Sequence, residues 1–133
     1  MKNLTVILVV LLLSACSSVK PDMSKAKQCS DNFLNALKEN NFEEALKYYS
    51  TDEFYSEGTE NRTGKMEELS TSIGKVISYS LTDSILVEEK EGGSSIVLTY
   101  KVENEKINSI QTFIIQNEDG EYKIISQDVR AGE

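Results

Sequence analysis

The spacing of the apolar side chains changes at Gly74, and this change limits the fold more than any other feature of the sequence. Before Gly74 they recur every three or four residues, as on one face of a helix; after it they recur at every second residue, as on one face of a strand. Helices followed by a run of strands are typical of an α+β domain, in which the helices pack on one face of an antiparallel sheet. A chain of 133 residues is long enough for one such domain.

The segment before Gly74 is expected to form helices separated by short polar connections. Helical spacing predicts the first helix from Ser24 to Asn40, and Asn41 with Glu44 three residues later resembles a capping box that begins the second. Ser50 repeats the capping signal for a short turn that carries Phe54 and Tyr55. A polar loop is expected at residues 56–63, followed by a short helix whose apolar side is Met66, Leu69 and Ile73.

After Gly74 the sequence predicts four strands in a meander. Turn signals rich in Gly, Asn, Asp and Glu occupy residues 91–94, 103–106 and 117–120. The strand from Ile107 to Gln116 is apolar on both faces at residues 113–115, which indicates a position near the centre of the sheet. In the first strand, one face is predicted to carry Tyr79, Leu81, Ile85 and Val87.

This order of elements resembles the cystatin-like cone shared by nuclear transport factor two, ketosteroid isomerase and many small lipoproteins. The resemblance spans residues 24–129, from the long helix through the short pair that carries residues 42–49 to the sheet. It implies N-terminal helices packed on a curled antiparallel sheet of four or more strands. It is a likeness of architecture and carries no motif of one activity, because a fold alone does not fix a function.

The N-terminus has the features of a secretory signal. Lys2 precedes an apolar run from Leu4 to Leu13, which covers about half of the ~30 Å hydrocarbon thickness of a bilayer. The competing interpretation is an uncleaved anchor helix, but the run stops at Ser14. Residues 13–16, Leu-Ser-Ala-Cys, resemble the lipobox of bacterial lipoproteins. The resemblance implies a diacylglycerol thioether on Cys16, cleavage before it, and an acyl chain such as palmitate on the new amino group.

These features predict the organisation of the chain and its location. Residues 1–15 are the predicted signal peptide, residues 16–23 a tether and residues 24–130 a single cystatin-like domain. The protein is expected to be lipid-anchored outside the cytoplasm, in the bacterial cell envelope. The residue after Cys16 is Ser17 and not aspartate, which by resemblance is compatible with sorting to the outer membrane in a cell that has one. In a cell without an outer membrane, the anchor is expected in the outer face of the cell membrane.

Composition disfavours several classes of function. Without the signal peptide the chain has 13 basic and 22 acidic residues, and such a balance disfavours nucleic acid, which is bound by clusters of Lys and Arg. Histidine is absent, which removes Ser–His and Cys–His nucleophile pairs and imidazole metal sites. The sequence therefore predicts no cofactor, no metal site and no catalytic residue of these kinds.

The candidate functional residues each have a structural alternative. Cys29 lies on the apolar stripe of the first helix and is interpreted as a small buried hydrophobe rather than a reactive thiol. Asp83 shares the alternation of its apolar neighbours, so it is either a buried carboxylate of raised pKa or an exposed residue beside a β-bulge; Asp128 has a similar ambiguity. Tyr49, Tyr79, Asp83 and Tyr100 are the candidate residues for the lining of a pocket, although tyrosines at such positions commonly belong to the core.

Three functions are compatible with these residues. The first is a non-catalytic binding module for a small apolar ligand or another envelope protein. The second is an enzyme similar to ketosteroid isomerase, with Asp83 or Asp128 as base, although the first helix lacks the tyrosine which that resemblance implies. The third is a purely protein-binding inhibitor or assembly factor. It predicts no pocket of ligand size and an exposed apolar patch on the outer face of the sheet.

Overall fold

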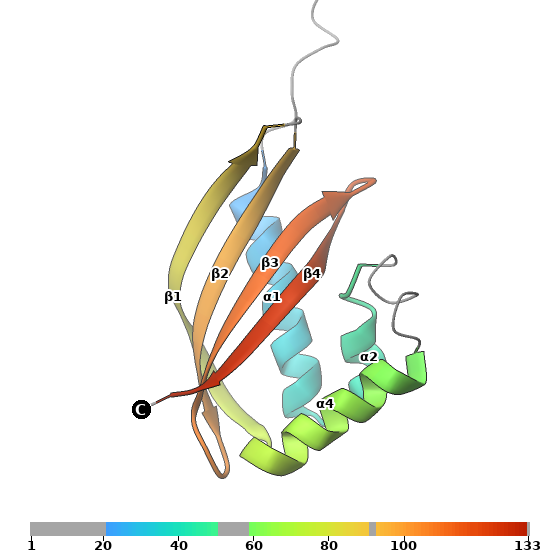
Figure 1. Cartoon of the computed structure of the whole chain (residues 1–133), viewed down its shortest axis with the longest axis vertical. Coiled ribbons are helices and arrows are strands. Elements are labelled where there is room, and N and C mark those ends of the chain that lie inside the picture. Colours follow the sequence, from blue (N-terminus) through green and yellow to red (C-terminus); the bar gives the residue numbers. More distant parts are fainter. Residues whose placement is uncertain (1–20, 51–58, 91–92, 133) are drawn as a thin grey trace, which may run out of the picture.

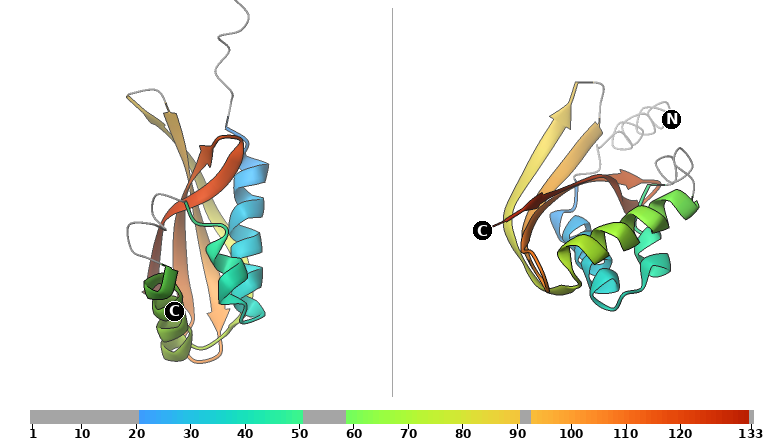
Figure 2. Two further views of the ribbon diagram at one scale, coloured as in Figure 1. Left: turned by 90° about the vertical axis from the view of Figure 1, so that its right-hand side faces the viewer. Right: turned by 60° about the horizontal axis from the view of Figure 1, so that its bottom comes forward.

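The computed structural model describes residues 21–50, 59–90 and 93–132, and within them helices precede a four-stranded antiparallel sheet, as the spacing predicted (Figure 1). The elements are α1 (Met23–Lys38), α2 (Phe42–Leu46), α4 (Thr59–Ile73), β1 (Val76–Glu89), β2 (Gly93–Asn104), β3 (Ser109–Glu118) and β4 (Glu121–Ala131). The strand order is β1-β2-β3-β4, which confirms the third strand as a central one. The sheet curls around α1, and α4 crosses the end of the molecule opposite to the N-terminus of α1 (Figure 2).

Short polar side chains determine where the first two helices begin. Asp22 accepts a hydrogen bond from the Lys25 amide at 3.2 Å, so α1 starts at Met23, one residue before the predicted start. Asn41 accepts from the Glu44 amide at 3.2 Å and caps α2, as predicted. Asn40 between the helices has a positive φ of 61°, a conformation that asparagine tolerates better than most residues.

Helix α4 begins at Thr59, so the predicted loop at residues 56–63 is wrong for residues 59–63. Residues 59–65 contain no apolar side chain, and apolar periodicity therefore gives no signal over the first two turns of this helix. The predicted turn with Phe54 and Tyr55 lies outside the described residues, as do the lipobox and the first half of the turn at residues 91–94.

The core lies between α1 and the concave face of the sheet. It contains Ala26, Phe33, Leu34, Ile96, Leu98, Tyr100, Val102, Phe113, Ile115 and Ile124. Edge-to-face ring contacts connect it, with centroids 5.6 Å apart for Phe33 and Phe113 and 5.7 Å for Tyr100 and Phe113. Each large apolar side chain buried in this way contributes about 1.5–3 kcal/mol to stability. Packing of α1 into a curled sheet therefore makes a large contribution to the stability of the domain.

A β-bulge divides β1 into two parts with opposite orientations. Leu81 lies opposite Tyr100, which is buried on the concave face, but Asp83 lies opposite Thr99, the next residue of β2. Thr82 is therefore the extra residue, and every side chain after it changes face. The prediction that Tyr79, Leu81, Ile85 and Val87 share one face is thus wrong: the last two lie on the convex face.

Candidate functional site

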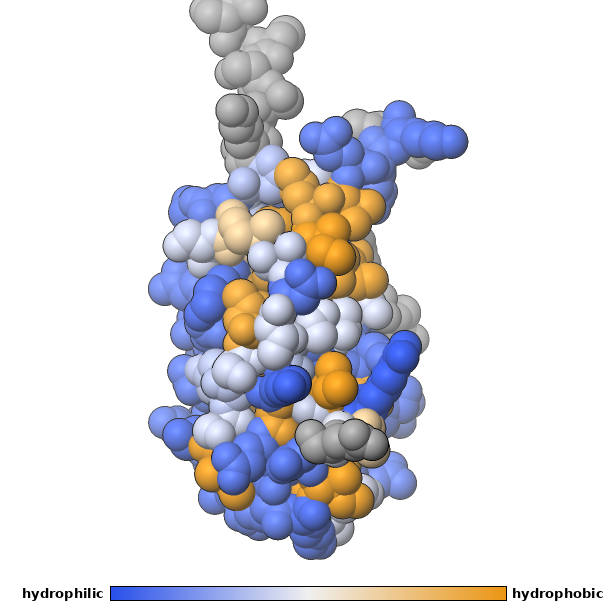
Figure 3. All heavy atoms as spheres, turned by 90° about the vertical axis from the view of Figure 1, so that its left-hand side faces the viewer, coloured by the Kyte–Doolittle hydropathy of each residue, from blue (hydrophilic) through white to orange (hydrophobic). Residues whose placement is uncertain are grey.

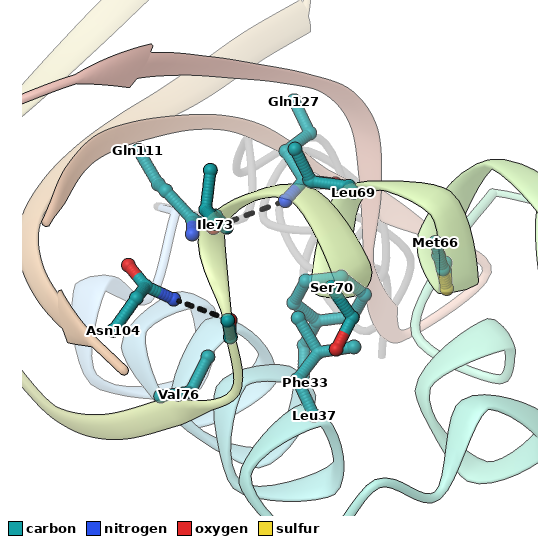
Figure 4. A pocket seen from close by; sticks show the side chains of 11 residues that line it. Phe33, Leu37, Met66, Leu69, Ser70, Ile73, Val76, Asn104, Gln111 and Gln127 are labelled. Atoms are coloured by element: carbon teal, nitrogen blue, oxygen red, sulfur yellow. Dashed lines mark hydrogen bonds between the residues drawn. The ribbon is translucent and has the colours of Figure 1, made fainter. Parts of the chain in front are cut away.

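A small cavity lies between α1, α4 and the concave face of the sheet (Figure 4). Its lining consists of Phe33, Leu37, Met66, Leu69, Ser70, Ile73, Gly74, Val76, Asn104, Gln111 and Gln127. The volume open to the centre of a water molecule is about 30 Å³. One water needs roughly 10–15 Å³ on this measure, whereas pockets for small organic ligands are roughly 300–1,000 Å³. In this conformation the cavity has room for about two waters.

Polar side chains form a continuous hydrogen-bonded chain along the concave face beside this cavity. Tyr49 donates its hydroxyl hydrogen to Oε1 of Gln127, whose Nε2 donates to Oε1 of Gln111 at 3.1 Å. Nε2 of Gln111 donates to Oγ of Ser109 at 3.2 Å, and that hydroxyl lies 2.9 Å from the Asn104 side-chain amide. We refer to these five residues as the polar chain. They satisfy one another, which avoids the roughly 1–3 kcal/mol penalty of a buried polar group without a partner.

Helix α4 closes the cavity from the side opposite to the sheet. Its apolar residues Met66, Leu69 and Ile73 face the cavity, and the first of them is buried. Nearer the start of the helix, the guanidinium carbon of Arg62 lies 4.4 Å from the centroid of the Tyr49 ring. Such a cation–π contact contributes about 0.5–2 kcal/mol and fixes α4 against the segment that follows α2.

A second polar cluster lies between α1 and the sheet, on the side of β1 and β2. The Tyr100 hydroxyl lies 2.6 Å from Oγ of Ser30 and donates to Oδ1 of Asp31 at 2.9 Å. Lys27 is paired with the other oxygen of Asp31 at 2.5 Å, and Tyr79 donates to Oδ1 of Asn35 at 2.8 Å. Burial raises the pKa of the Tyr100 hydroxyl, and its hydrogen bond to Asp31 raises it further. This hydroxyl is therefore a neutral donor that holds α1 on the sheet.

The structure does not bring Tyr49, Tyr79, Asp83 and Tyr100 together in one pocket. None of the four lines the cavity; Tyr49 reaches it only through Gln127, whereas Tyr79 and Tyr100 point toward α1. Asp83 is exposed on the convex face and accepts from the Ser84 amide at 2.9 Å. The bulge at Thr82 is the reason, because it turns Asp83 away from the face that carries Tyr79. The second candidate base, Asp128, is also exposed, and it is paired with Arg130 at 2.7 Å.

The likeness of this cone to solved structures is clear, whereas its sequence has no match. No protein-family model matches the chain, and no relative is found among curated proteins. A candidate scytalone dehydratase from Novosphingobium aromaticivorans superposes with a TM-score of 0.56 at 13% identity, over 84% of each chain. An NTF2-like protein from Cytophaga hutchinsonii superposes with a TM-score of 0.55 at 14% identity, over 84% of this chain and 99% of that one.

The domain has the NTF2-like fold. At identities of 13% and 14% the likeness extends to the fold alone. What this NTF2-like domain does must therefore be argued from its own residues.

The polar chain of the NTF2-like domain was not identified from sequence, although one signal was present. Gln111 falls on the same alternation as Phe113 and Ile115, so a regular strand places its amide among buried apolar side chains, where it is only 1% exposed. A buried glutamine needs partners, and Gln127 is one that a meander brings onto the neighbouring strand. Asn104 and Ser109 adjoin a turn and gave no comparable signal.

Cys29 is buried in the NTF2-like domain, as predicted, and its thiol lies 3.8 Å from the Tyr48 carbonyl oxygen. Burial raises the pKa of the thiol from 9.0 to about 11, and Lys123 opposes this only in part. A rise of two units leaves about 100-fold less thiolate at pH 8, and the thiolate is the reactive form. We therefore predict that iodoacetamide modifies Cys29 in the folded domain at least about 100-fold more slowly than free cysteine.

The pKa of Cys29 also predicts a pH dependence of stability. Because only the unfolded thiol ionises between pH 9.0 and about 11, stability should fall as the pH rises through this range. For the iodoacetamide prediction, alkylation in urea is the control, since Cys29 of the unfolded chain should react at the rate of free cysteine. Equal rates of Cys29 alkylation in the folded and the unfolded chain would contradict the burial of this thiol.

No group of three or more His, Cys, Asp or Glu side chains suited to a metal ion occurs within residues 21–50, 59–90 and 93–132. Among the helices that the structure describes, none is both long and apolar enough to cross a membrane.

Proposed function

We propose that this chain is a lipid-anchored protein of the bacterial cell envelope whose NTF2-like domain binds another protein and carries out no chemical step. The volume of the cavity is the observation that carries the proposal. At about 30 Å³ it is roughly one tenth of the smallest pocket that commonly holds an organic ligand. Its amide groups are bonded to one another and do not point into open space, so the site has the character of a polar core.

Exposed apolar residues on the outside of the domain favour a protein partner. Ile85 and Val87 are 50% and 42% exposed on the convex face of β1, and Leu86, which lies between them on the opposite face, is 44% exposed. Figure 3, which views the molecule from the side of β1, shows hydrophobic residues gathered toward one end of this side. Contiguous apolar surface on a soluble domain commonly marks a site of protein–protein contact. A cavity too small for an organic ligand together with exposed apolar side chains on the sheet is expected for a protein-binding module.

The other two functions find less support. Binding of a small apolar ligand in this cavity requires α4 to move away from the sheet; the observation in its favour is that the cavity is already lined by apolar and amide side chains. An enzyme with an aspartate base requires a carboxylate in the cavity. Among the described residues that line it there is none, and Asp83 and Asp128 are both exposed.

In-cell photocrosslinking tests the proposed function. A photoreactive amino acid is placed at Thr82, which is exposed beside the apolar surface, and in a matched control at Ser72, which is exposed on α4. We expect a protein adduct in the native host from Thr82 and not from Ser72, with binding reproduced between the two purified proteins. An adduct from Ser72 alone would support a protein-binding function but would place the binding surface on α4 and not on β1. Absence of any adduct would contradict a protein-binding role. So would native mass spectrometry that shows a small molecule bound to the purified chain in a one-to-one ratio.

A further inference from the structure

The free edge of β1 is the feature that the proposed function leaves unassigned. An edge strand presents backbone N–H and C=O groups that a further strand can pair with. At the other edge of the sheet, β4 is paired locally, since the Ser50 amide donates to the Ile124 carbonyl at 2.8 Å and the Ile124 amide to the Tyr48 carbonyl at 2.7 Å. In the described part of the chain, no strand pairs with β1 on the side away from β2.

Beyond the bulge, the convex face of this edge has a defined pattern of side chains. Ile85 lies opposite Val97 and Val87 opposite Ser95, so both point to the convex face. Asp83 and Glu89 lie on the same face, two residues before and two residues after this apolar pair. A run of six residues at about 3.3 Å each places the two carboxyl groups roughly 20 Å apart, with two exposed apolar side chains between them.

Neighbouring groups hold both carboxylates on this face. Oδ1 of Asp83 accepts from the Ser84 amide at 2.9 Å. Oε1 of Glu89 accepts from Oγ of Ser95 at 3.2 Å and from Nε2 of Gln116 at 3.4 Å. The edge therefore presents two negative charges at fixed positions on either side of an apolar pair.

These charges oppose pairing of the edge with a second copy of itself. An antiparallel register that sets Leu86 opposite Leu86 sets Asp83 opposite Glu89 of the other copy, and a register that sets Ile85 opposite Ile85 sets Asp83 opposite Val87. The first register places like charges directly opposite one another twice, which is destabilising, and the second leaves each Asp83 carboxylate opposite an apolar side chain without a cation. The complementary occupant is a different chain.

We propose that residues 83–89 are the site where an extended segment of a partner protein adds to the sheet as a strand, and that this segment carries two apolar residues at alternate positions with a lysine or arginine two residues before and after them. This inference rests on the proposed protein-binding function and specifies how the partner binds, namely by strand addition. Main-chain hydrogen bonds supply affinity in strand addition, and the side chains at alternate positions supply specificity. In an antiparallel register the two cations lie opposite Asp83 and Glu89, and the apolar pair lies opposite Ile85 and Val87.

A designed peptide tests this site. It has nine residues, in which lysine, isoleucine, valine and lysine alternate with threonine, and it is titrated into the ¹⁵N-labelled full chain in detergent. The amide resonances of residues 83–89 should shift. A peptide with glutamate in place of both lysines should bind at least tenfold more weakly. The variant Asp83→Lys/Glu89→Lys should reverse this preference, whereas the control Glu67→Lys/Glu68→Lys, which changes the net charge equally on α4, should leave it unchanged.

Each outcome of the titration either supports or overturns the strand-addition site. Amide shifts confined to residues 83–89 together with the reversed preference support the site. No binding, shifts centred elsewhere, or equal affinity for both peptides would overturn it. If the peptide fails while a partner still crosslinks from Thr82, only the strand-addition site is wrong; if no partner crosslinks at all, the proposed function itself is wrong.

Discussion

Replacing Gly74 with alanine is expected to lower the free energy of unfolding by about 3–5 kcal/mol, because two penalties act together. Gly74 has a φ of +87°, and an added Cβ would lie 2.6 Å from the Lys106 nitrogen and 2.8 Å from Cβ of Glu105. Relief of that contact would displace the turn after β2, where the amides of Lys106 and Ile107 donate to the Ile73 carbonyl at 3.0 and 2.9 Å. Urea denaturation followed by circular dichroism measures the change.

Gly64→Ala is the matched control, because it makes the same chemical change inside α4, the helix that Gly74 follows. A Cβ at Gly64 would meet no atom within 4 Å. Since glycine inside a helix is less favourable than alanine by about 0.5–1 kcal/mol, this variant should be more stable than the wild type. Equal urea midpoints for Gly74→Ala and the wild type would contradict the close packing of the α4–β1 junction on the turn after β2.

The elements of the fold that follow from local spacing were predictable. Gly74 separates two periodicities, Asn41 caps α2 through its own side chain, and the turn after β3 carries Asp119 and Gly120 at φ of 52° and 93°. Each of these features depends on residues within one or two turns of chain. The polar start of α4 was not predictable in this way, because its first two turns contain no apolar residue to set a period.

The candidate site was less predictable, because it depends on pairs that are distant in sequence. Tyr49 and Gln127 are 78 residues apart, and nothing in the spacing of either residue indicates the other. The single extra residue at Thr82 exchanged the faces of Asp83, Ile85 and Val87, and thereby moved the predicted pocket residue from the concave to the convex side. A bulge is set by pairing with the next strand, so alternation within β1 indicated that one was possible but not which residue it would include.

A lipid anchor at Cys16, as proposed, would determine which surfaces of the domain another protein can reach. Six residues of extended chain span at most about 20 Å from Cys16 to Asp22. The Asp22 amide donates to the Tyr122 hydroxyl at 2.7 Å, which ties the start of α1 to β4. A lipid at Cys16 would therefore keep this end of the molecule near the membrane. α4, which crosses the opposite end of the molecule, would point away from it (Figure 1).

Replacing Cys16 with serine is accordingly expected to reduce incorporation of labelled palmitate to background in the native host. Serine has no thiol, and in the lipoproteins that this chain resembles a diacylglycerol thioether forms on the cysteine before cleavage. The wild-type chain should have the intact mass of residues 16–133 with its acyl groups. Two or more acyl chains, at about 0.8 kcal/mol for each buried CH₂, hold a protein on a bilayer stably, whereas one short chain does not. Cys29→Ser is the matched control and should keep the full label, since Cys29 is buried and faces the Tyr48 carbonyl. A wild-type chain that retains Met1, or a Cys16→Ser chain that still carries palmitate, would contradict the lipid anchor and with it the envelope location on which the proposed function depends.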